Sequence, residues 1–370
     1  MTFPPAAVKS SDKSVKGSGV NETGLKRRAT VHDVARAAGV SLATVDRVLN
    51  GRPGVRAKTA EKVASAIAEI GFQRDLGASL LARARDLRLS FIIPDGSNEF
   101  MASLAEAVMR RSGPALADRM HIETRRVRAL NAEDLVHSLD ALDPRACDCA
   151  IIVASDEPAV RAAVDEATRR GIAVLTLVSD LPGTQRRHFI GIDNVSAGRT
   201  AASLMGRFLP QGGKVGVIAG SLNLRDHAER LSGFSAVLEA QFPAITLLGP
   251  LEGHDAEAET EALAARLIAT HPDLAGIYNL GAGNAGLVVA LDASSRAGAI
   301  RVIAHELTGS TRMGLVSGAI DVVLDQNPDG EIGQAIAAAR LLALDAGGRS
   351  QKKGDTEPIE IGIFLRDNLR

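Results

Sequence analysis

The sequence predicts an α/β protein in which a small all-α helix-turn-helix head precedes a two-lobed body of doubly wound parallel sheets. Three observations support this fold class. The chain has 370 residues, enough for two or three domains of about 100 to 200 residues each. Three short helical patterns lie near the N-terminus, and from residue 87 onward short apolar runs alternate with alanine-rich helical patterns. This alternation is typical of parallel strands covered by helices on both faces.

The first segment is rich in Ser, Gly and Lys and has almost no apolar periodicity, so we expect a disordered tail over residues 1–28. The head is expected over residues 29–74. Its helical patterns are TVHDVARAAG, SLATVDRVLN and RAKTAEKVASAIAEIG. Thr30 and Ser41 stand where N-caps are preferred, and Gly39 stands at the end of the first pattern. Two short helices joined by so tight a turn form the helix-turn-helix arrangement.

Charge is distributed unevenly along the chain. Residues 26–85 contain 12 basic and 5 acidic side chains, whereas the whole chain has a net charge of −1. A basic head therefore precedes an acidic body. Clustered Lys and Arg indicate a polyanion as the partner of the head, because counterion release favours basic groups placed along phosphates. A solvated charged surface is the alternative interpretation.

The body is expected over residues 88–370, after a hinge helix or linker at 75–87. Its apolar runs are too numerous for one sheet, so we expect two lobes of about five or six strands each. The two lobes are expected to span about 88–193 with 325–347, and about 196–322 with 356–370.

Polar residues follow many of the apolar runs, at the carboxyl ends of the expected strands. Open parallel sheets bind their ligands beyond these ends. The residues are Asp95, Asn98, Asp156, Asp180, Asp193, Asn279, Glu306 and Gln326. The sequence therefore predicts a ligand cleft between the two lobes.

Several classes of protein and site are disfavoured. No stretch reaches the roughly 18 uncharged apolar residues that span a bilayer, and residues 1–28 lack the apolar segment of a secretory signal. We therefore expect a cytoplasmic protein without a membrane partner. Cys147 and Cys149 have no nearby His or Cys to complete a zinc set, so we expect them to be buried at a strand edge. No dinucleotide fingerprint, phosphate-binding loop or paired nucleophile and base is evident, and neither a cofactor nor enzyme activity is expected.

The segment ATVHDVARAAGVSLATVDRVLNGRPGVRAKTAEKVASAIAEIGF, together with the body, resembles the lactose-repressor family of bacterial transcription regulators. The body is also similar to periplasmic sugar-binding proteins of the ribose-binding type, through PDGSNEF, AERLSGF, AHE and DQNP. The resemblance implies a repressor that binds a pseudo-palindromic operator in double-stranded DNA as a homodimer, or as a tetramer. It also implies a small effector in the cleft, which is a sugar, a polyol or a sugar phosphate, and a location on the nucleoid.

The second helix of the head is the expected recognition helix. With its N-terminus in the major groove, Leu42 and Ala43 would face thymine methyl groups, and Arg47 would reach a guanine. Asn50 is suited either to adenine or to capping the helix end. The residues expected to contact DNA are Thr30, Ser41, Leu42, Ala43, Thr44, Asp46, Arg47, Asn50, Arg56 and Leu81.

Asp46 departs from the family pattern, which usually has Ser at this position. A carboxylate repels a phosphate, so it would accept a hydrogen bond from cytosine N4 or hold Arg47 or a neighbouring Arg in position. We favour the Arg-positioning role.

The hinge helix is expected over DLGASLLARAR, Asp75–Arg85. The resemblance implies that Leu81 inserts into the minor groove at the operator centre, as apolar wedges do. Arg74 and Asp75 stand where the family usually has Pro-Asn, and Gly77 weakens a helix by about 1 kcal/mol. A linker helix without groove contact is the alternative.

The resemblance to the sugar-binding proteins also implies the residues that contact the effector. They are Asn98, Phe100, Arg230, Glu306 and Gln326, with Asp180, Asn279 and Asn284 as further members. Family members commonly have Asp where Glu306 stands. Arg230 admits an anionic effector such as a sugar phosphate, because guanidinium binds phosphate bidentately. Structural alternatives are a surface pair between Arg230 and Glu229 and a simple turn at each Asn.

Other functions are weighed against a ligand-responsive regulator. A solute-binding protein of a sugar transporter would need a secretory signal and no basic head. A sugar-phosphate-responsive activator, or an enzyme acting on a sugar, would use the same cleft. The sequence leaves open whether the effector releases the operator or promotes its binding.

Overall fold

A computed structural model describes residues 29–49, 54–70, 86–345 and 357–369. The chain divides into two compact units, residues 1–75 and residues 76–370. Asn50 and the expected hinge with Leu81 lie outside the described residues.

The head contains three helices, α1 (Val31–Ala38), α2 (Leu42–Leu49) and α3 (Ala57–Ile70). A small core forms around the fully buried side chains of Val34, Val45 and Val63, one from each helix. The hydroxyl of Thr30 and the carboxylate of Asp33 form a reciprocal capping box at the start of α1. Helix α1 ends at Gly39, whose φ of 63° lies in the left-handed region. The predicted helix-turn-helix arrangement is confirmed.

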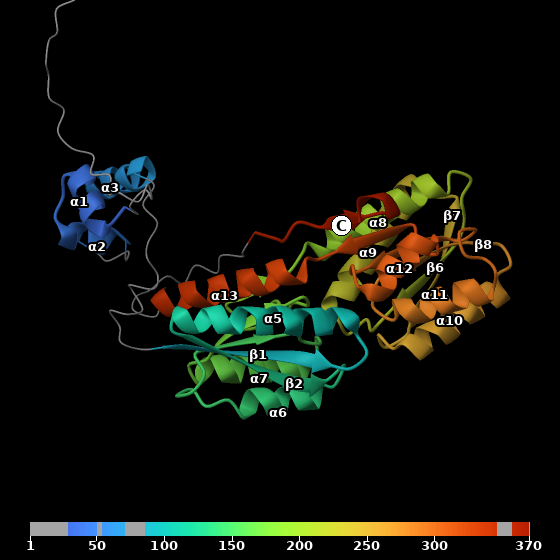
Figure 1. Ribbon diagram of the computed structural model, residues 1–370, viewed down its shortest axis with the longest axis horizontal. Coiled ribbons are helices and arrows are strands. Elements are labelled where there is room, and N and C mark those ends of the chain that lie inside the picture. Colours follow the sequence, from blue (N-terminus) through green and yellow to red (C-terminus); the bar gives the residue numbers. More distant parts are fainter. Residues whose placement is uncertain (1–28, 50–53, 71–85, 346–356, 370) are drawn as a thin grey trace, which may run out of the picture. The chain divides into compact units, whose positions relative to one another are not determined.

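The first lobe of the body has a five-stranded parallel sheet in the order β2-β1-β3-β4-β5. Helices α5 and α13 cover one face, and α6 and α7 cover the other (Figure 1). The strands are β1 (Leu87–Asp95), β2 (Met120–Arg128), β3 (Cys149–Ile152), β4 (Ala173–Leu177) and β5 (His188–Ile190). The helices are α5 (Glu99–Ala117), α6 (Ala132–Asp140), α7 (Pro158–Arg169) and α13 (Pro328–Asp345).

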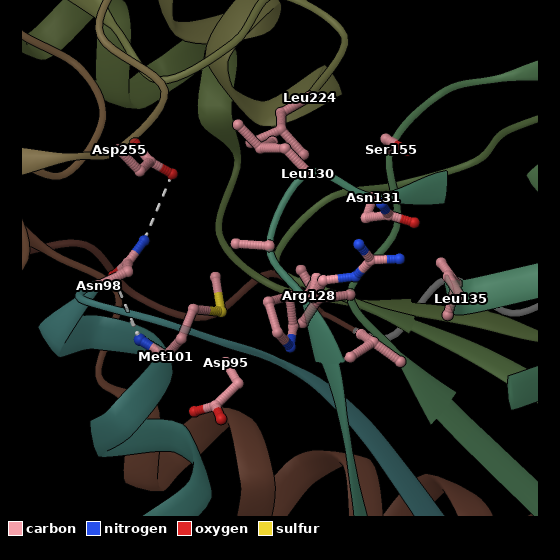
Figure 2. A pocket seen from close by; sticks show the side chains of 14 residues that line it. Asp95, Asn98, Met101, Arg128, Leu130, Asn131, Leu135, Ser155, Leu224 and Asp255 are labelled. Atoms are coloured by element: carbon pink, nitrogen blue, oxygen red, sulfur yellow. Dashed lines mark hydrogen bonds between the residues drawn. The ribbon is translucent and has the colours of Figure 1, made fainter. Parts of the chain in front are cut away.

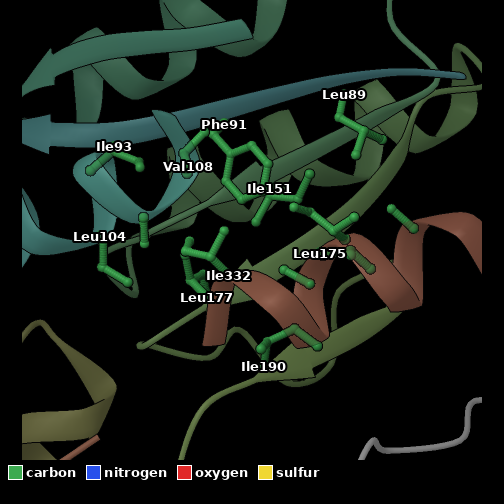
Figure 3. Packing of buried hydrophobic residues seen from close by; sticks show 14 of the residues in the cluster. Leu89, Phe91, Ile93, Leu104, Val108, Ile151, Leu175, Leu177, Ile190 and Ile332 are labelled. Atoms are coloured by element: carbon green, nitrogen blue, oxygen red, sulfur yellow. The ribbon is translucent and has the colours of Figure 1, made fainter. Parts of the chain in front are cut away.

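Apolar side chains on both faces of β1, β3 and β4 hold this lobe together. On β1, Leu89, Phe91 and Ile93 pack under α5 and α13 (Figure 3), while Ile92 packs on the opposite face. Strands buried on both faces must be apolar throughout, which explains the continuous apolar runs of the sequence. Cys147 and Cys149 are buried, as expected, and burial raises the pKa of the Cys147 thiol to about 11.

The second lobe has a six-stranded sheet in the order β11-β10-β9-β8-β6-β7, in which only β11 runs antiparallel to its neighbour. Helices α8 and α9 pack on one face, and α10, α11 and α12 pack on the other. The strands are β6 (Gly213–Ala219), β7 (Ile245–Glu252), β8 (Leu274–Asn279), β9 (Arg301–His305), β10 (Val322–Asp325) and β11 (Gly362–Phe364). The helices are α8 (Asn194–Phe208), α9 (Arg225–Gln241), α10 (Glu257–Thr270), α11 (Asn284–Ala293) and α12 (Gly309–Ser317), with a 3₁₀ turn at Arg366–Asn368.

Helices α8 and α9 approach each other closely through two glycines. A Cβ atom on Gly198 would lie 1.9 Å from the carbonyl oxygen of Arg230, and one on Gly233 would lie 2.1 Å from that of Val195. A side chain at either glycine would therefore push the two helix backbones apart. This contact fixes the position of Arg230 on α9.

The predicted fold class is confirmed, because both lobes are doubly wound parallel sheets. The first five strands of each lobe follow the same order, with the second strand at one edge and the first beside the third. Doubly wound sheets bind ligands where such an order reverses, which is between β1 and β3 and between β6 and β8. In the described part of the chain, no helix combines the length and the apolar character needed to cross a bilayer.

Candidate effector pocket and nucleic-acid interface

Helix α2 presents the predicted recognition face to solvent. Val45 is fully buried against the head, whereas Leu42 is 41% exposed and Ala43, Asp46 and Arg47 are exposed as well. Small apolar groups and one guanidinium therefore occupy the outer side of a helix held from behind. Such a surface suits base edges in a major groove.

The remaining expected contacts in the head lie at the starts of the three helices. Thr30 uses its hydroxyl in the capping box of α1, where it donates to Asp33 Oδ2 at 2.7 Å. The hydroxyls of Ser41 and Thr44 lie 2.9 Å apart at the start of α2. Arg56 is exposed directly before α3. The structure thus gives Thr30 and Ser41 capping roles and leaves the guanidinium of Arg56 accessible.

The inner pocket of the body lies between the two lobes, at the carboxyl ends of both sheets. Its first-lobe side is formed by Asn98 and Phe100 at the start of α5 and by residues that follow β3 and β4. Its second-lobe side comes from α9 and from the loops after β7, β8, β9 and β10, and its polar members are Asp226, His227, Arg230, Asp255, Glu306 and Gln326. Five expected contacts, Asn98, Phe100, Arg230, Glu306 and Gln326, lie together in this pocket.

Arg230 is the centre of the polar cluster. Its side chain is 2% exposed, and it donates from Nε to Asn194 Oδ1 and from Nη1 to the carbonyl of Leu280, each at 2.9 Å. Its Nη2 lies 3.6 Å from Glu306 Oε1 and 3.8 Å from Asp226 Oδ2. The alternative of a surface pair between Arg230 and Glu229 is wrong, because the partner of Glu229 is Arg225 at 2.7 Å.

Glu306 follows β9 and points its carboxyl group toward Arg230 and Gln326. Its Oε1 accepts a hydrogen bond from Gln326 Nε2 at 2.7 Å. Burial raises the pKa of Glu306 to about 8, although Arg230 opposes this rise. Its φ of 69° is left-handed, a conformation that costs a side-chain-bearing residue about 1 kcal/mol or more. Strain and burial at one residue are typical of a functional site.

Asn279 and Asn284 support the loops beneath the pocket. Asn279 Nδ2 donates to Asn284 Oδ1 at 2.8 Å and to the carbonyl of Ala282 at 2.9 Å. Asn284 Nδ2 donates to the carbonyl of His305 at 3.1 Å. Both side chains are buried. They connect the segments that follow β8 and β9, and neither lines the inner pocket.

Asp180 is placed differently from the expectation. Its carboxylate is bound within the first lobe by Arg186 at 2.5 Å, by the hydroxyl of Thr176 at 2.8 Å and by the amide of Leu181 at 2.7 Å. These donors occupy its carboxylate, and Asp180 is not among the residues that line the inner pocket. Its neighbour Ser179 lines the inner pocket instead, and the hydroxyl of Ser179 accepts a hydrogen bond from the amide of Arg225 at 3.0 Å.

Asn98 connects the two lobes. Its Oδ1 accepts from the amides of Phe100 and Met101 and so caps α5, while its Nδ2 donates to Asp255 Oδ2 at 3.3 Å (Figure 2). A second connection joins Ser310 to Glu99 at 2.5 Å. Burial raises the pKa of Glu99, but hydrogen bonds from Ser310 and Thr308 outweigh it and lower that pKa below its ordinary value. The described lobes are therefore held in contact by hydrogen bonds.

An outer pocket adjoins the inner one. It shares Asn98, Met101 and Asp255 with the inner pocket and continues along the edge of the first lobe (Figure 2). Its additional apolar lining includes Leu130 and Leu135. The combined site offers a polar cluster next to an apolar surface, which is how pockets bind a sugar ring and its hydroxyl groups.

Sequence reasoning missed three acidic or basic residues that line the inner pocket, which are Asp226, His227 and Asp255. It also missed Glu331, whose pKa is affected by the charges of Glu306 and Arg230. Asp226 stands four residues before Arg230, so helical spacing was a usable signal. Asp255 and Glu331 gave no comparable signal, because both resemble ordinary acidic residues near a helix start. Among the described residues, no group of three or more His, Cys, Asp or Glu side chains is arranged to hold a metal ion.

Two family models match the chain. The periplasmic binding protein domain matches residues 89–348, and the lacI family of bacterial regulatory proteins matches residues 30–75. Catabolite control protein A of Priestia megaterium is 44% identical over 79 residues, which are 21% of this chain and 24% of that protein. The transcriptional regulator GalS of Salmonella typhimurium is 28% identical over 219 residues, 57% of this chain and 60% of GalS. The chain thus spans a quarter to three fifths of these curated relatives.

Two of the solved structures similar to the body are ABC transporter solute-binding proteins. One from Burkholderia graminis, in complex with D-arabinose, has a TM-score of 0.70 at 23% identity and covers 77% of this chain and 97% of its own. One from Agrobacterium vitis, bound to α-D-tagatopyranose, has a TM-score of 0.68 at 21% identity, with 76% and 96% covered. At these identities the likeness concerns the fold.

Proposed function

This chain belongs to the periplasmic binding protein domain family and carries a head of the lacI family of bacterial regulatory proteins, and from that premise we propose that it is a ligand-responsive transcription regulator. The observation that carries the proposal is that one chain contains both an exposed recognition face and a buried polar pocket. An exposed recognition face on α2 suits DNA, and a buried polar cluster between two lobes suits a small effector.

The DNA partner is a pseudo-palindromic double-stranded operator, bound by a homodimer that acts as a repressor in the cytoplasm, on the nucleoid. Two heads related by a two-fold axis read two half-sites, so the symmetry of the operator follows that of the protein. Leu42, Ala43 and Arg47 contact bases, and Arg56 contacts phosphate.

Exposed apolar side chains on the body support self-association. Two groups of large apolar side chains lie exposed on pairs of packed helices, one on α5 and α13 and the other on α11 and α12. Their members are Met109 (70% exposed), Leu116 (56%) and Leu341 (57%), and Val289 (50%), Met313 (69%) and Val316 (63%).

The effector is a sugar or polyol held between the lobes, where Asn98 and Phe100 act from the first lobe and Arg230, Glu306 and Gln326 from the second. Its binding favours one angle between the lobes over another, and it thereby changes how the paired heads fit the operator. The D-arabinose and α-D-tagatopyranose bound by the similar solute-binding proteins support this class of ligand.

Selection of DNA from a random double-stranded pool by the purified chain tests the regulator. We expect enrichment of a two-fold-related sequence and its loss in Arg47→Ala, with Arg207→Ala on α8 as the control that removes a charge from the body. A screen of sugars and polyols by thermal shift tests the effector, because a ligand that binds only the folded state raises its stability. Enrichment of no sequence, or of the same sequence by Arg47→Ala, would contradict the proposal.

A further inference from the structure

Four buried side chains of the inner pocket have polar atoms without a hydrogen-bond partner among the described residues. They are Asp226 Oδ1, Arg230 Nη2, Glu306 Oε2 and Gln326 Oε1, and each of these side chains belongs to a residue that is at most 4% exposed. All four residues line the same pocket. Buried polar atoms are normally paired, so this set indicates the chemistry of a ligand.

These four unpaired atoms require both hydrogen-bond donors and an acceptor from the ligand. Ionised Asp226 and the amide oxygen of Gln326 only accept, whereas Arg230 only donates, and Glu306 accepts or donates according to its protonation. A ligand must therefore supply at least two donors next to an acceptor. Hydroxyl groups do both, but a phosphate dianion or a carboxylate supplies acceptors alone.

The charge at the pocket also disfavours an anion. Arg230 and His227 are the basic side chains of the lining. Asp226, one helical turn before Arg230 on α9, lies 3.8 Å from Arg230 Nη2 and 3.7 Å from His227 Nε2. Asp255 adds a second carboxylate to the lining, although Asn98 and the amide of Ala282 already bind its oxygens. An anion-binding guanidinium needs its charge directed at the ligand, and here carboxylates surround it.

We propose that Asp226 is a specificity-determining residue which restricts the pocket to uncharged polyhydroxylated effectors and excludes phosphorylated and carboxylated sugars. This inference rests on the proposed function, because it concerns the same effector. Asp226 acts in two ways: its Oδ1 accepts a hydrogen bond from an effector hydroxyl, and its charge offsets that of Arg230. It excludes the sugar-phosphate effector that Arg230 by itself would admit.

The experiment compares the full chain with Asp226→Asn and with Glu229→Gln. Glu229 lies on the same helix in a pair with Arg225 and does not line the inner pocket. Its substitution also replaces a carboxylate by an amide, so it makes the same change in net charge without altering the pocket. Thermal shift and calorimetry are run with inorganic phosphate, and with glucose, ribose and their phosphates, at constant ionic strength. Inorganic phosphate tests the anion response without knowledge of the effector.

We expect no stabilisation of the wild type by inorganic phosphate or by either sugar phosphate. Asp226→Asn should bind inorganic phosphate at least about tenfold more tightly than the wild type does, a factor that corresponds to about 1.4 kcal/mol, whereas Glu229→Gln should not differ from the wild type. A wild type that binds a sugar phosphate better than the parent sugar overturns the inference. An equal phosphate gain in both variants, or a gain in neither, also overturns it.

The outcomes separate this inference from the proposed function. If no sugar stabilises the wild type but Asp226→Asn gains phosphate affinity, the charge inference stands and the sugar effector is contradicted. If a sugar phosphate binds the wild type and changes its affinity for the selected DNA, the regulator stands and the inference is wrong. This second case is measured on the wild type alone, so it can overturn the inference even if Asp226→Asn fails to fold.

Discussion

Asp46 is the acidic residue on the face of α2 that we expect to lie against DNA. It is exposed beside Arg47, and its carboxylate repels phosphate oxygens at close range. Asp46→Ser should therefore tighten operator binding and steepen the dependence of the association constant on salt, because one more favourable phosphate contact releases one more counterion. Fluorescence anisotropy with the selected DNA at several salt concentrations measures both. Unchanged affinity and slope would exclude this account of Asp46.

Glu331 lies at the first turn of α13 and is fully buried, with no hydrogen-bond partner for either carboxylate oxygen among the described residues. Burial, followed by the charge of Glu306, raises the pKa of Glu331 well above its ordinary 4.5. A carboxyl group whose pKa is raised by folding binds more protons in the folded state than in the unfolded one. Its contribution to stability is therefore present at low pH and is lost as pH rises above about 4.5.

Glu331→Gln should remove the loss of stability that ionisation of Glu331 causes as pH rises. The difference in unfolding free energy between the variant and the wild type should grow in favour of the variant from pH 5 to pH 8, by up to a few kcal/mol, because a pKa change of one corresponds to about 1.4 kcal/mol. Chemical denaturation at a series of pH values without effector measures this difference. Glu239→Gln on the exposed side of α9 is the control, for which the difference should stay constant with pH.

At the residue scale, the structure places Asp180 differently from the position expected for it. Asp180 follows β4, the predicted kind of position, but Arg186 and Thr176 bind its carboxylate. Neither partner is recognisable from strand spacing. Glu306 and Gln326 line the inner pocket because they follow strands whose carboxyl ends meet at the lobe interface. Their orientation depends on the left-handed backbone at Glu306, which no pattern of residue types indicates.

At the scale of elements, the α8–α9 contact sets the position of Arg230. Gly198→Ala would place a methyl group against the carbonyl of Arg230, and neither helix backbone can yield without repacking. We expect a loss of about 1–3 kcal/mol in unfolding free energy, as for other overpacked sites, with weaker sugar binding. Ser203→Ala on the same helix adds no volume, and its effect should stay within about 0.5 kcal/mol. Equal stability of the two variants would contradict this role of Gly198.

Elements were more predictable than their contacts. The apolar runs that form β1, β3 and β4 are buried on both faces of the sheet. This double burial requires a continuous apolar run, which is recognisable in the sequence. The caps at Thr30, Ser41 and Gly39 were likewise recognisable, because their residue types satisfy or end a helix locally. Asp226 was missed because its burial does not arise from its own helix. It lies in the first turn of α9, where acidic residues are usually exposed, and segments distant in the sequence bury it.

At the scale of the whole molecule, a basic head and an acidic body should respond differently to salt. DNA affinity should fall steeply with ionic strength, because the head supplies the phosphate contacts. Effector affinity should change little, because the inner pocket favours an uncharged ligand. Arg56→Ala should reduce the magnitude of the salt slope for DNA by about 1 per head and therefore by about 2 for the dimer, whereas Arg207→Ala on α8 should leave it unchanged. An effector affinity that follows the same slope as DNA would contradict this separation.

The shared strand order of the two lobes suggests how such a pocket originates. Duplication of one ancestral half would produce two sheets with the same order, facing each other with equivalent loops. The loop after β1, which provides Asn98, then has its counterpart in the loop after β6, which leads into α9 with Asp226 and Arg230. Divergence of one copy could alter ligand choice while the other preserved binding, so the evolution of a new effector would require changes in only one half of the chain.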